Sequence, residues 1–467
     1  MTPRRLRELG FVVAALAAIA AYVLSNMDLL ADTFWYVATG RSVLDGHGLP
    51  PVDPFSFSAV RSHWVVHMPG SVVLFAWLDR HVGLRSLLDV STLVETTALG
   101  LLWLTRARTF ASRVLALPLL FFAIYLQRDD LCARGQIFGD LVFIVLLLLV
   151  ARIREGARWP LVIAPLLGAM WVNLHSSFPL GALVPLVSAV GLVFEQHGER
   201  GAISRLVVFA AGLAVGTMVN PYGLELVQSV LLLASHPTTF QQKLFLPPDF
   251  LRLDTLLTYG VAAVALALRA RADAKPYAVS DALLIAMFAL AAASGVRYLP
   301  HLVLISIFAI APELEGAARV IETRAASAWA PITVVASLLA LGFAGSVLRT
   351  PKDVFQNVPI EAARFVRQHE PSGNVINDYH WGGFLLYVWE GHPKLFIDGR
   401  SYLYLNGVFE DASALANGSP GYEDLLEIYD AKHALLERGS PLAITLEQRH
   451  HWKVVFVDPL SVVLEHP

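Results

Sequence analysis

The sequence predicts a polytopic α-helical membrane protein of about eleven transmembrane helices, followed by a small C-terminal α/β domain outside the membrane. Of its 467 residues, 56% are hydrophobic and 16% are charged, and the mean hydropathy is +0.57. These values lie outside the range of soluble globular proteins. From residue 350 the composition returns to that of a soluble domain, so we expect a transmembrane domain over 1–349 and a soluble domain over 350–467.

Eleven apolar stretches are candidates for transmembrane helices. They lie near residues 9–27, 86–105, 114–127, 137–151, 160–173, 178–194, 206–219, 255–268, 279–294, 299–312 and 328–347. Several are shorter than the roughly 20 residues that a perpendicular helix needs, so some helices should begin inside the flanking loops. The first stretch follows three arginines and could instead be a secretory signal, although no clear cleavage site precedes Asp28.

The basic residues set the expected topology. Residues 69–82 are apolar but short and end in three polar side chains, so we expect an interfacial helix there and not a twelfth span. With eleven spans and a cytoplasmic N-terminus, every inside loop carries at least two basic residues, as the positive-inside rule requires. These residues are Arg4, Arg5, Arg7, Arg106, Arg108, Arg113, Arg152, Arg154, Arg158, Arg200, Arg205, Arg269, Arg271, Lys275, Arg319 and Arg324. The first outer loop, residues 28–85, and the tail are therefore expected outside.

The tail alternates strand-like and helix-like segments. An amphipathic helix is expected over 359–369. Expected strands lie at 374–377, 394–397, 433–436, 453–457 and 461–464, with helices near 383–390, 420–430 and 441–451 between them. This alternation predicts a parallel or mixed α/β domain. No long Gly/Ser linker precedes it, so we expect it to pack on the membrane part.

Asp28 and Asp32 follow the first apolar span and precede a helical segment at 34–44 that we expect along the outer interface. A carboxylate at that depth can accept a proton from an acceptor hydroxyl or amide while an activated sugar is attacked. The alternative is that both acids cap the helix and are solvated. We favour the structural interpretation for Asp28 and the functional one for Asp32.

A second polar group lies between two spans, in the segment from Arg128 to Gln136. Arg134 could bind the phosphate of a lipid carrier through its planar guanidinium. Asp129 or Asp130 could supply a second acid or a metal ligand. The alternative is a charged loop whose acids and arginines neutralise one another, and the sequence does not separate the two interpretations.

Two more candidates lie at the outer ends of spans. His175 could contact substrate, although a single histidine near a helix end is more often structural. Arg297 is a phosphate-binding candidate, because an arginine at membrane depth without an obvious acidic neighbour needs an anion.

The tail contributes a further group of candidates, which follow predicted strands, where α/β domains bind ligands. Asp378 and Trp381 precede two glycines that permit close backbone approach, and the tryptophan offers a flat face to a sugar or peptide. Asp398 and Arg400 follow the next predicted strand. The alternative is a strand-turn-helix built from ordinary turn residues.

These features together resemble the GT-C superfamily of polyprenyl-phosphate-sugar-dependent membrane glycosyltransferases. The resemblance implies a GT-C-like fold, with Asp32 as the first-loop catalytic acid, Asp129 or Asp130 as the second-loop acid, and Arg297 as the contact to the carrier phosphate. Residues 378–382 are faintly similar to the Trp-Trp-Asp-x-Gly acceptor motif of oligosaccharyltransferases, without its paired tryptophans.

The sequence thus predicts a glycosyltransferase of the bacterial cytoplasmic membrane that moves a sugar from a polyprenyl-phosphate or polyprenyl-diphosphate donor to an acceptor on the outer face. Asp32 with Asp129 or Asp130 would suit a divalent metal such as Mg²⁺ or Mn²⁺, although the spacing does not require one. A net charge of -3 indicates no nucleic-acid partner. The alternatives are a non-catalytic binder of lipid-linked glycans, a transporter, or an accessory subunit that docks a partner through an exposed aromatic segment at 402–404.

Overall fold

The chain forms two compact units. The computed structural model describes residues 2–59, 62–195, 200–235, 246–270, 277–349, 353–355 and 357–467. The helical unit comprises Met1–Met27, Asp89–Leu131 and Gly135–Lys352, and the mixed unit comprises Asp28–Leu88, Cys132–Arg134 and Asp353–Pro467. Arg271 and Lys275 of the charge pattern, and residue 350 at the expected domain boundary, lie outside the described residues.

The helical unit is built almost entirely from apolar helices. They are α1 (Pro3–Asn26), α4 (Ser86–Arg106), α5 (Phe110–Gln127), α6 (Gln136–Arg154), α7 (Pro160–Leu174), α8 (Pro179–Val193), α9 (Arg200–Gly216), α10 (Leu224–Ser235), α11 (Leu253–Ala270), α12 (Ala278–Ser294), η3 (Val296–Tyr298) and α13 (Leu299–Arg349). Among the described residues, six helical stretches are long and apolar enough to cross a membrane, and six shorter apolar helices accompany them. The protein is therefore a membrane protein, while the expected count of eleven spans is not confirmed.

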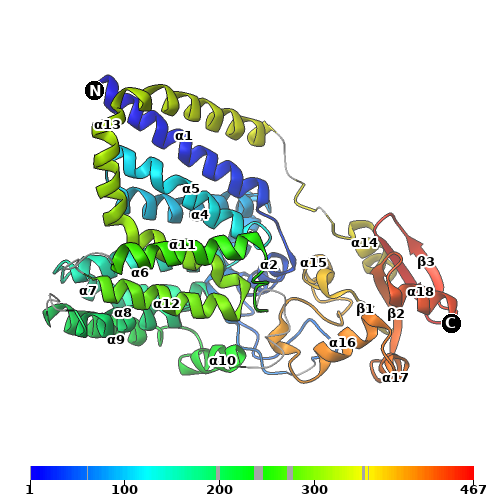
Figure 1. Cartoon of the computed structure of the whole chain (residues 1–467). Helices are drawn as coiled ribbons and strands as arrows, with labels where there is room; N and C mark the ends of the chain where they lie inside the picture. Colours follow the sequence, from blue (N-terminus) through cyan, green and yellow to red (C-terminus); the bar gives the residue numbers. More distant parts are fainter. Residues whose placement is uncertain are drawn as a thin grey trace. The chain divides into compact units, whose positions relative to one another are not determined.

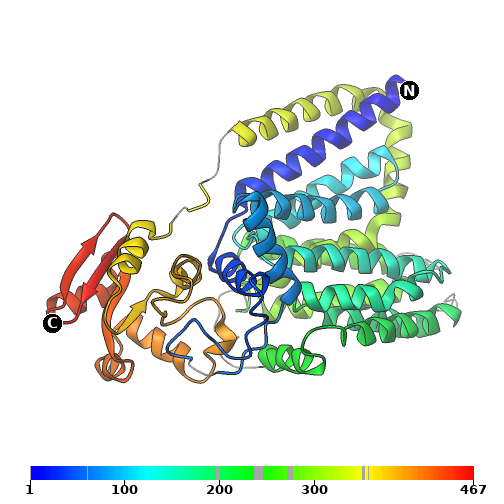
Figure 2. The same cartoon turned by 180° about the vertical axis from the view of Figure 1, so that it is seen from behind.

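Helix α13 contains the last two apolar stretches expected from the sequence. It is one continuous helix of 51 residues, and a straight helix of that length would extend about 76 Å. Figures 1 and 2 show α13 turning between its halves, so that its second half lies beside α1. Its two apolar stretches, Val296–Val320 and Val334–Leu348, correspond to the two expected spans.

Small residues let the membrane helices approach closely. A Cβ atom added to Gly168 on α7 would lie 2.1 Å from the carbonyl oxygen of Leu213 on α9, and one added to Gly216 on α9 would lie 2.1 Å from the carbonyl oxygen of Pro165. Glycine is needed here because two backbones occupy the space of a side chain, as is common where helices pack in membranes. Figure 1 shows α8, α9, α11 and α12 running side by side in this region.

A buried ionic network joins four helices of the helical unit. Arg154 on α6 donates to Asp281 on α12 at 2.7 Å, and Arg269 on α11 lies 2.9 Å from the same carboxylate and 3.0 Å from Glu313 on α13. Ser280 and Ser188 accept further hydrogen bonds from Arg154. Buried charges require such partners, so the network holds the ends of these helices together.

The mixed unit carries a four-stranded sheet with the order β1-β2-β4-β3. Its strands are β1 (Asn374–Asn377), β2 (Ala431–Glu437), β3 (Lys453–Val457) and β4 (Ser461–Glu465); β1 pairs parallel to β2, and the other neighbours are antiparallel. The sheet is thus mixed, as the sequence allows. Its helices are α2 (Ala31–Leu44), α3 (Pro69–Val82), α14 (Ile360–His369), α15 (Tyr379–Trp389), η4 (Ser401–Leu403), α16 (Val408–Asn417), α17 (Tyr422–Ile428) and α18 (Pro441–Gln448).

The expected strand at 394–397 is wrong. Only Leu395 forms bridges, one to Val375 of β1 and one to Ser56 of the first loop. The Leu395 carbonyl accepts from the Phe57 N–H at 3.0 Å, and the Leu395 N–H donates to Phe55 at 3.1 Å. These bonds join the first loop to the tail inside one compact unit. The domain boundary at residues 349 and 350 stays a prediction, since the contacts group residues 28–88 with the tail.

Candidate active site

Asp32 lies in the first turn of α2, where the N–H groups and the helix dipole favour a negative charge. One carboxylate oxygen accepts from Nη1 of Arg134 at 3.3 Å, and the other accepts from Nε1 of Trp35 at 3.2 Å. The Asp32 side chain is 31% exposed and that of Arg134 is 15% exposed. The ion pair is therefore held in place and still open to a ligand.

The segment that carries Arg134 is fixed to the start of α2. The Ala133 N–H donates to the Asp28 carbonyl at 2.9 Å, and the Thr33 hydroxyl donates to the Ala133 carbonyl at 2.7 Å. Cys132 is buried beside the Thr33 hydroxyl at 3.4 Å, and burial raises the pKa of its thiol to about 11. The thiol thus stays protonated and serves packing.

Helix α15 and the segment after it form the opposite wall of the site. Phe34 of α2 packs edge-on against Phe384 of α15 with a centroid distance of 5.3 Å. A Cβ atom added to Gly399 would lie 2.8 Å from Oδ1 of Asp32 and 3.5 Å from the Trp35 ring. A Cβ atom added to Gly382 would lie 2.1 Å from the Ile397 carbonyl oxygen. At Gly382, the close approach expected from the sequence is therefore made by the protein's own backbone at Ile397.

Tyr379 is a site residue that the sequence interpretation did not single out. Burial raises the pKa of its phenol, and the negative charges of Asp32 and Asp398 raise it further. Tyr379 is thus a protonated hydroxyl near Asp32. Its place directly after Asp378, which caps α15 by accepting from the His380 N–H at 2.9 Å, was the one signal in the sequence.

Asp398 and Arg400 form a fully buried network. Arg400 donates to both oxygens of Asp398, with a shortest distance of 2.6 Å, and to Asp53 of the first loop at 2.7 Å. The Tyr404 hydroxyl donates to Asp398 at 2.9 Å, and the Arg400 guanidinium lies over the Trp64 ring at 4.6 Å. Burial lowers the pKa of Arg400, but Asp398, Tyr404 and Asp53 outweigh it and raise the pKa.

The role predicted for Asp398 and Arg400 in substrate binding stays a prediction that this geometry does not favour, because both side chains are 0% exposed. The expected exposure of the aromatic segment at 402–404 is wrong. Leu403 and Tyr404 are buried, and Tyr402 accepts from Nε1 of Trp64 at 2.7 Å.

A pocket of about 260 Å³ lies beside the start of α2. Its polar lining includes Asp28, Asp353 and His380, and its apolar lining includes Phe34 and Trp381. Trp381 is largely buried and donates from Nε1 to the Asn357 carbonyl at 3.1 Å. The pocket thus combines acidic groups with apolar walls at the start of α2, and neither Asp32 nor Arg134 lines it.

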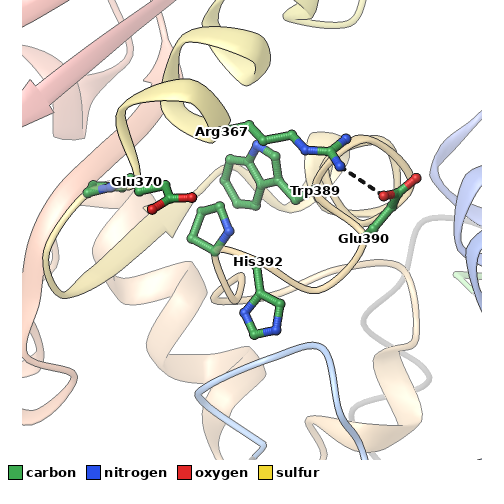
Figure 3. A pocket seen from close by; sticks show the side chains of 7 residues that line it. Arg367, Glu370, Trp389, Glu390 and His392 are labelled. Atoms are coloured by element: carbon green, nitrogen blue, oxygen red, sulfur yellow. Dashed lines mark hydrogen bonds and ion pairs between the residues drawn. The ribbon is translucent and has the colours of Figure 1, made fainter.

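A second hollow, of about 540 Å³, lies among α14, α15 and the turn that follows α15 (Figure 3). Arg367, Glu370, Trp389, Glu390 and His392 line it, together with two prolines. Arg367 and Glu390 form an ion pair of 2.8 Å across it. It contains none of the site residues expected from the sequence.

The remaining candidates belong to the helical unit. Asp129 is largely exposed and pairs with Arg128 at 3.3 Å, and the Asp130 N–H donates to the Gln127 carbonyl at 2.8 Å. His175 is buried, and its Nδ1 lies 2.8 Å from the Ser177 hydroxyl. Arg297 lies in η3, with its guanidinium 5.9 Å from the Tyr298 ring centroid. These assignments stay predictions.

The donors around Asp32 do not fit a divalent metal. Both carboxylate oxygens face hydrogen-bond donors, and one of these donors is the cationic Arg134. In the part of the chain that the structure describes, no group of three or more His, Cys, Asp or Glu side chains is arranged to hold a metal ion.

The chain has a fold similar to that of solved archaeal oligosaccharyltransferases. The chain is similar to the oligosaccharyltransferase AglB of the archaeon Archaeoglobus fulgidus in complex with an inhibitory peptide and a dolichol-phosphate, with a TM-score of 0.63 and 11% identity. An A. fulgidus oligosaccharyltransferase matches with a TM-score of 0.59 when tethered to an acceptor peptide with an NVT sequon, and of 0.57 in its apo form, each at 12% identity.

The alignments cover 94–95% of this chain and 70% of the archaeal chain. No protein-family model and no curated protein sequence matches. At this level of identity the likeness shows the fold alone.

Proposed function

We propose that the chain is an integral membrane glycosyltransferase that moves a sugar from a polyprenyl-phosphate or polyprenyl-diphosphate donor to an acceptor on the outer face of the bacterial cytoplasmic membrane. The observation that carries the proposal is the partly exposed ion pair of Asp32 and Arg134 at the start of α2. The chain shares its fold with an archaeal oligosaccharyltransferase solved with an inhibitory peptide and a dolichol-phosphate, which supports a lipid-linked donor.

The chemistry assigns each group a separate task. The acceptor's nucleophilic oxygen or nitrogen attacks the anomeric carbon of the sugar and transfers its proton to Asp32, while the bond from that carbon to the carrier phosphate breaks. The leaving phosphate keeps the bonding electron pair, and Arg134 stabilises its negative charge. The protonated Tyr379 hydroxyl can donate a hydrogen bond beside Asp32. The pocket lined by Asp28 and His380 would receive part of the acceptor or donor.

Turnover of radiolabelled polyprenyl-phosphate sugars by the purified full-length protein in nanodiscs tests the proposal. We expect Asp32→Asn to lower turnover by about 10²–10⁴-fold, the usual contribution of a positioned base. Asp45→Asn at the other end of α2, where the carboxylate is 49% exposed, should keep it. Gly399→Ala should also lower turnover, because its Cβ would displace the Asp32 carboxylate. Gly260→Ala, which meets nothing within 4 Å, is its control.

Turnover that survives Asp32→Asn would remove Asp32 from the mechanism. Absence of turnover with every donor in the wild type would favour the non-catalytic binder of lipid-linked glycans. The buried state of the segment at 402–404 already weakens the accessory-subunit alternative, which required an exposed aromatic surface.

A further inference from the structure

Three titratable side chains meet inside the helical unit, and the proposed transfer uses none of them. They are Glu95 on α4, Asp140 on α6 and His301 in the first turn of α13. His301 Nε2 lies 3.3 Å from Oδ1 of Asp140, and Glu95 lies within electrostatic range of Asp140. Glu95 is 1% exposed. Ionisable groups at this depth are costly in a membrane and usually functional.

The hydrogen-bonding capacity of this cluster is not used up by the surrounding protein. Oε2 of Glu95 and Nδ1 of His301 are buried and have no hydrogen-bond partner among the described residues. The hydroxyls of Ser91, Thr92 and Thr96 are also buried without a described partner. Ser91 and Thr92 precede Glu95 by four and three positions, and Thr96 follows it directly. Helix α4 therefore presents a polar strip along the face that carries the glutamate.

The walls around the cluster are apolar. The His301 ring stacks on Phe288 at 6.2 Å with an interplanar angle of 10°, and it meets Phe143 at 5.3 Å. Apolar surroundings and a second carboxylate nearby both disfavour the charged form of a carboxyl group. An unpartnered buried carboxylate is far more costly than a protonated carboxyl group, which is neutral and supplies its own donor.

Other charged groups lie mostly at the far ends of the same helices. Arg154 follows Asp140 by fourteen residues on α6, or about 21 Å along the axis, and it belongs to the network with Asp281 and Glu313. Helix α4 carries Asp89 and Arg106 on either side of Glu95. Arg297 precedes His301 by one turn and packs over Tyr298. The base in direct contact with Asp140 is therefore His301.

We propose that the helical unit contains an intramembrane proton-binding site, in which Glu95 holds a proton in the cluster with Asp140 and His301. The ligand is a proton and no bond other than to hydrogen forms or breaks. Glu95 is the neutral acid of the cluster, and its own O–H can donate to a neighbouring hydroxyl.

Infrared spectroscopy of the full-length protein in nanodiscs at pH 7 tests the site. The carbonyl stretch of a protonated carboxylic acid is separate from that of carboxylates and shifts in D₂O. We expect this band in the wild type and in Glu361→Gln, whose glutamate is 64% exposed, and its loss in Glu95→Gln. The same band in all three proteins, or its absence from the wild type, overturns the proposal.

Two further measurements keep the test decisive if Glu95→Gln does not fold. Incorporation of ¹³C-labelled glutamate into the wild type should shift the band, because the proton resides on a glutamate; an unshifted band contradicts the assignment. Replacing potassium by sodium in the buffer should leave the band in place. Its disappearance in sodium would mean that the cluster binds a metal cation and not a proton.

Discussion

Burial separates two acid–arginine pairs that look equivalent in the sequence. Asp32 with Arg134 is partly open, whereas Asp398 with Arg400 is closed off and bonded to Asp53. The sequence named Asp32 and Arg134 as separate candidates but could not reveal that they form a pair, because 102 positions separate them. Tyr379 was missed for the same reason, since its relation to Asp32 exists only in the folded chain.

His67 illustrates how burial makes a single residue sensitive to pH. It is 2% exposed and stacks on Tyr402 at 4.3 Å, and burial lowers its pKa to about 4. In the unfolded chain the imidazole has its ordinary pKa of about 6.5 and binds a proton below that pH. The contribution of neutral His67 to the stability of the fold is therefore complete above that pH and is lost as the pH falls from 6.5 toward 4. At pH 5 the free energy of unfolding is lower by about 2 kcal/mol.

Thermal unfolding of the full-length protein in nanodiscs at pH 7 and pH 5 measures this effect. His67→Phe keeps an aromatic ring against Tyr402 and cannot be protonated, so its loss of Tm between the two pH values should be smaller than that of the wild type. His47→Phe, at an exposed position, should behave as the wild type does. Equal losses in all three proteins would contradict the assignment.

At the scale of elements, hydropathy and turn residues predicted the helices and strands that depend on local sequence. They did not predict those whose extent depends on long-range contacts. The helix at 69–82 and the strands at 374–377 and 453–457 have the expected bounds, because apolar periodicity and flanking glycines are local signals. The strand at 394–397 failed, since its apolar run is buried by the first loop and pairs through Leu395 alone. Helices α10 and α16 were not predicted, and α13 was predicted as two separate spans, because long-range packing decides the extent of these helices.

Close packing of α7 on α9 gives a prediction for the helical unit. Gly168→Ala would place a Cβ 2.1 Å from the Leu213 carbonyl oxygen, and because backbone atoms cannot move aside, the helices must separate. We expect a loss of roughly 1–3 kcal/mol, as for other overpacked sites, seen as a lower Tm in nanodiscs. Gly260→Ala on α11 has free space and should be neutral or stabilising. Equal Tm values for the two variants would refute the packing argument.

For the whole molecule, the mixed unit is assembled from three stretches of chain that the membrane helices interrupt. Composition alone suggests one boundary, where the apolar spans end. It cannot reveal that the first loop belongs with the tail, because that association depends on paired groups such as Asp53 and Arg400. The resemblance seen in the order of spans and outer-loop acids implied a membrane glycosyltransferase fold, and the fold is similar to that of an archaeal oligosaccharyltransferase.

The Arg400 network should therefore control the stability of the mixed unit. Arg400→Met leaves Asp398 and Asp53 buried without their cation, which costs about 3–5 kcal/mol when one partner of a buried pair is removed. We expect faster limited proteolysis of the first loop and the tail together. Arg438→Met, at an exposed position, is the matched control and should digest at the wild-type rate. Digestion of the tail alone would show that the two stretches are not joined through Arg400.

The bond between Asp53 and Arg400 also sets the timing of biogenesis, because 347 positions separate the two residues. At a synthesis rate of about 5–20 residues per second, the first loop emerges roughly 20–70 s before its arginine partner has been made. During that interval Asp53 and the apolar side chains around it have no tail to cover them. The ribosome must therefore finish almost the whole protein before the Asp32 site acquires its Gly399 wall, and a chain stalled in the last helices carries an incomplete site.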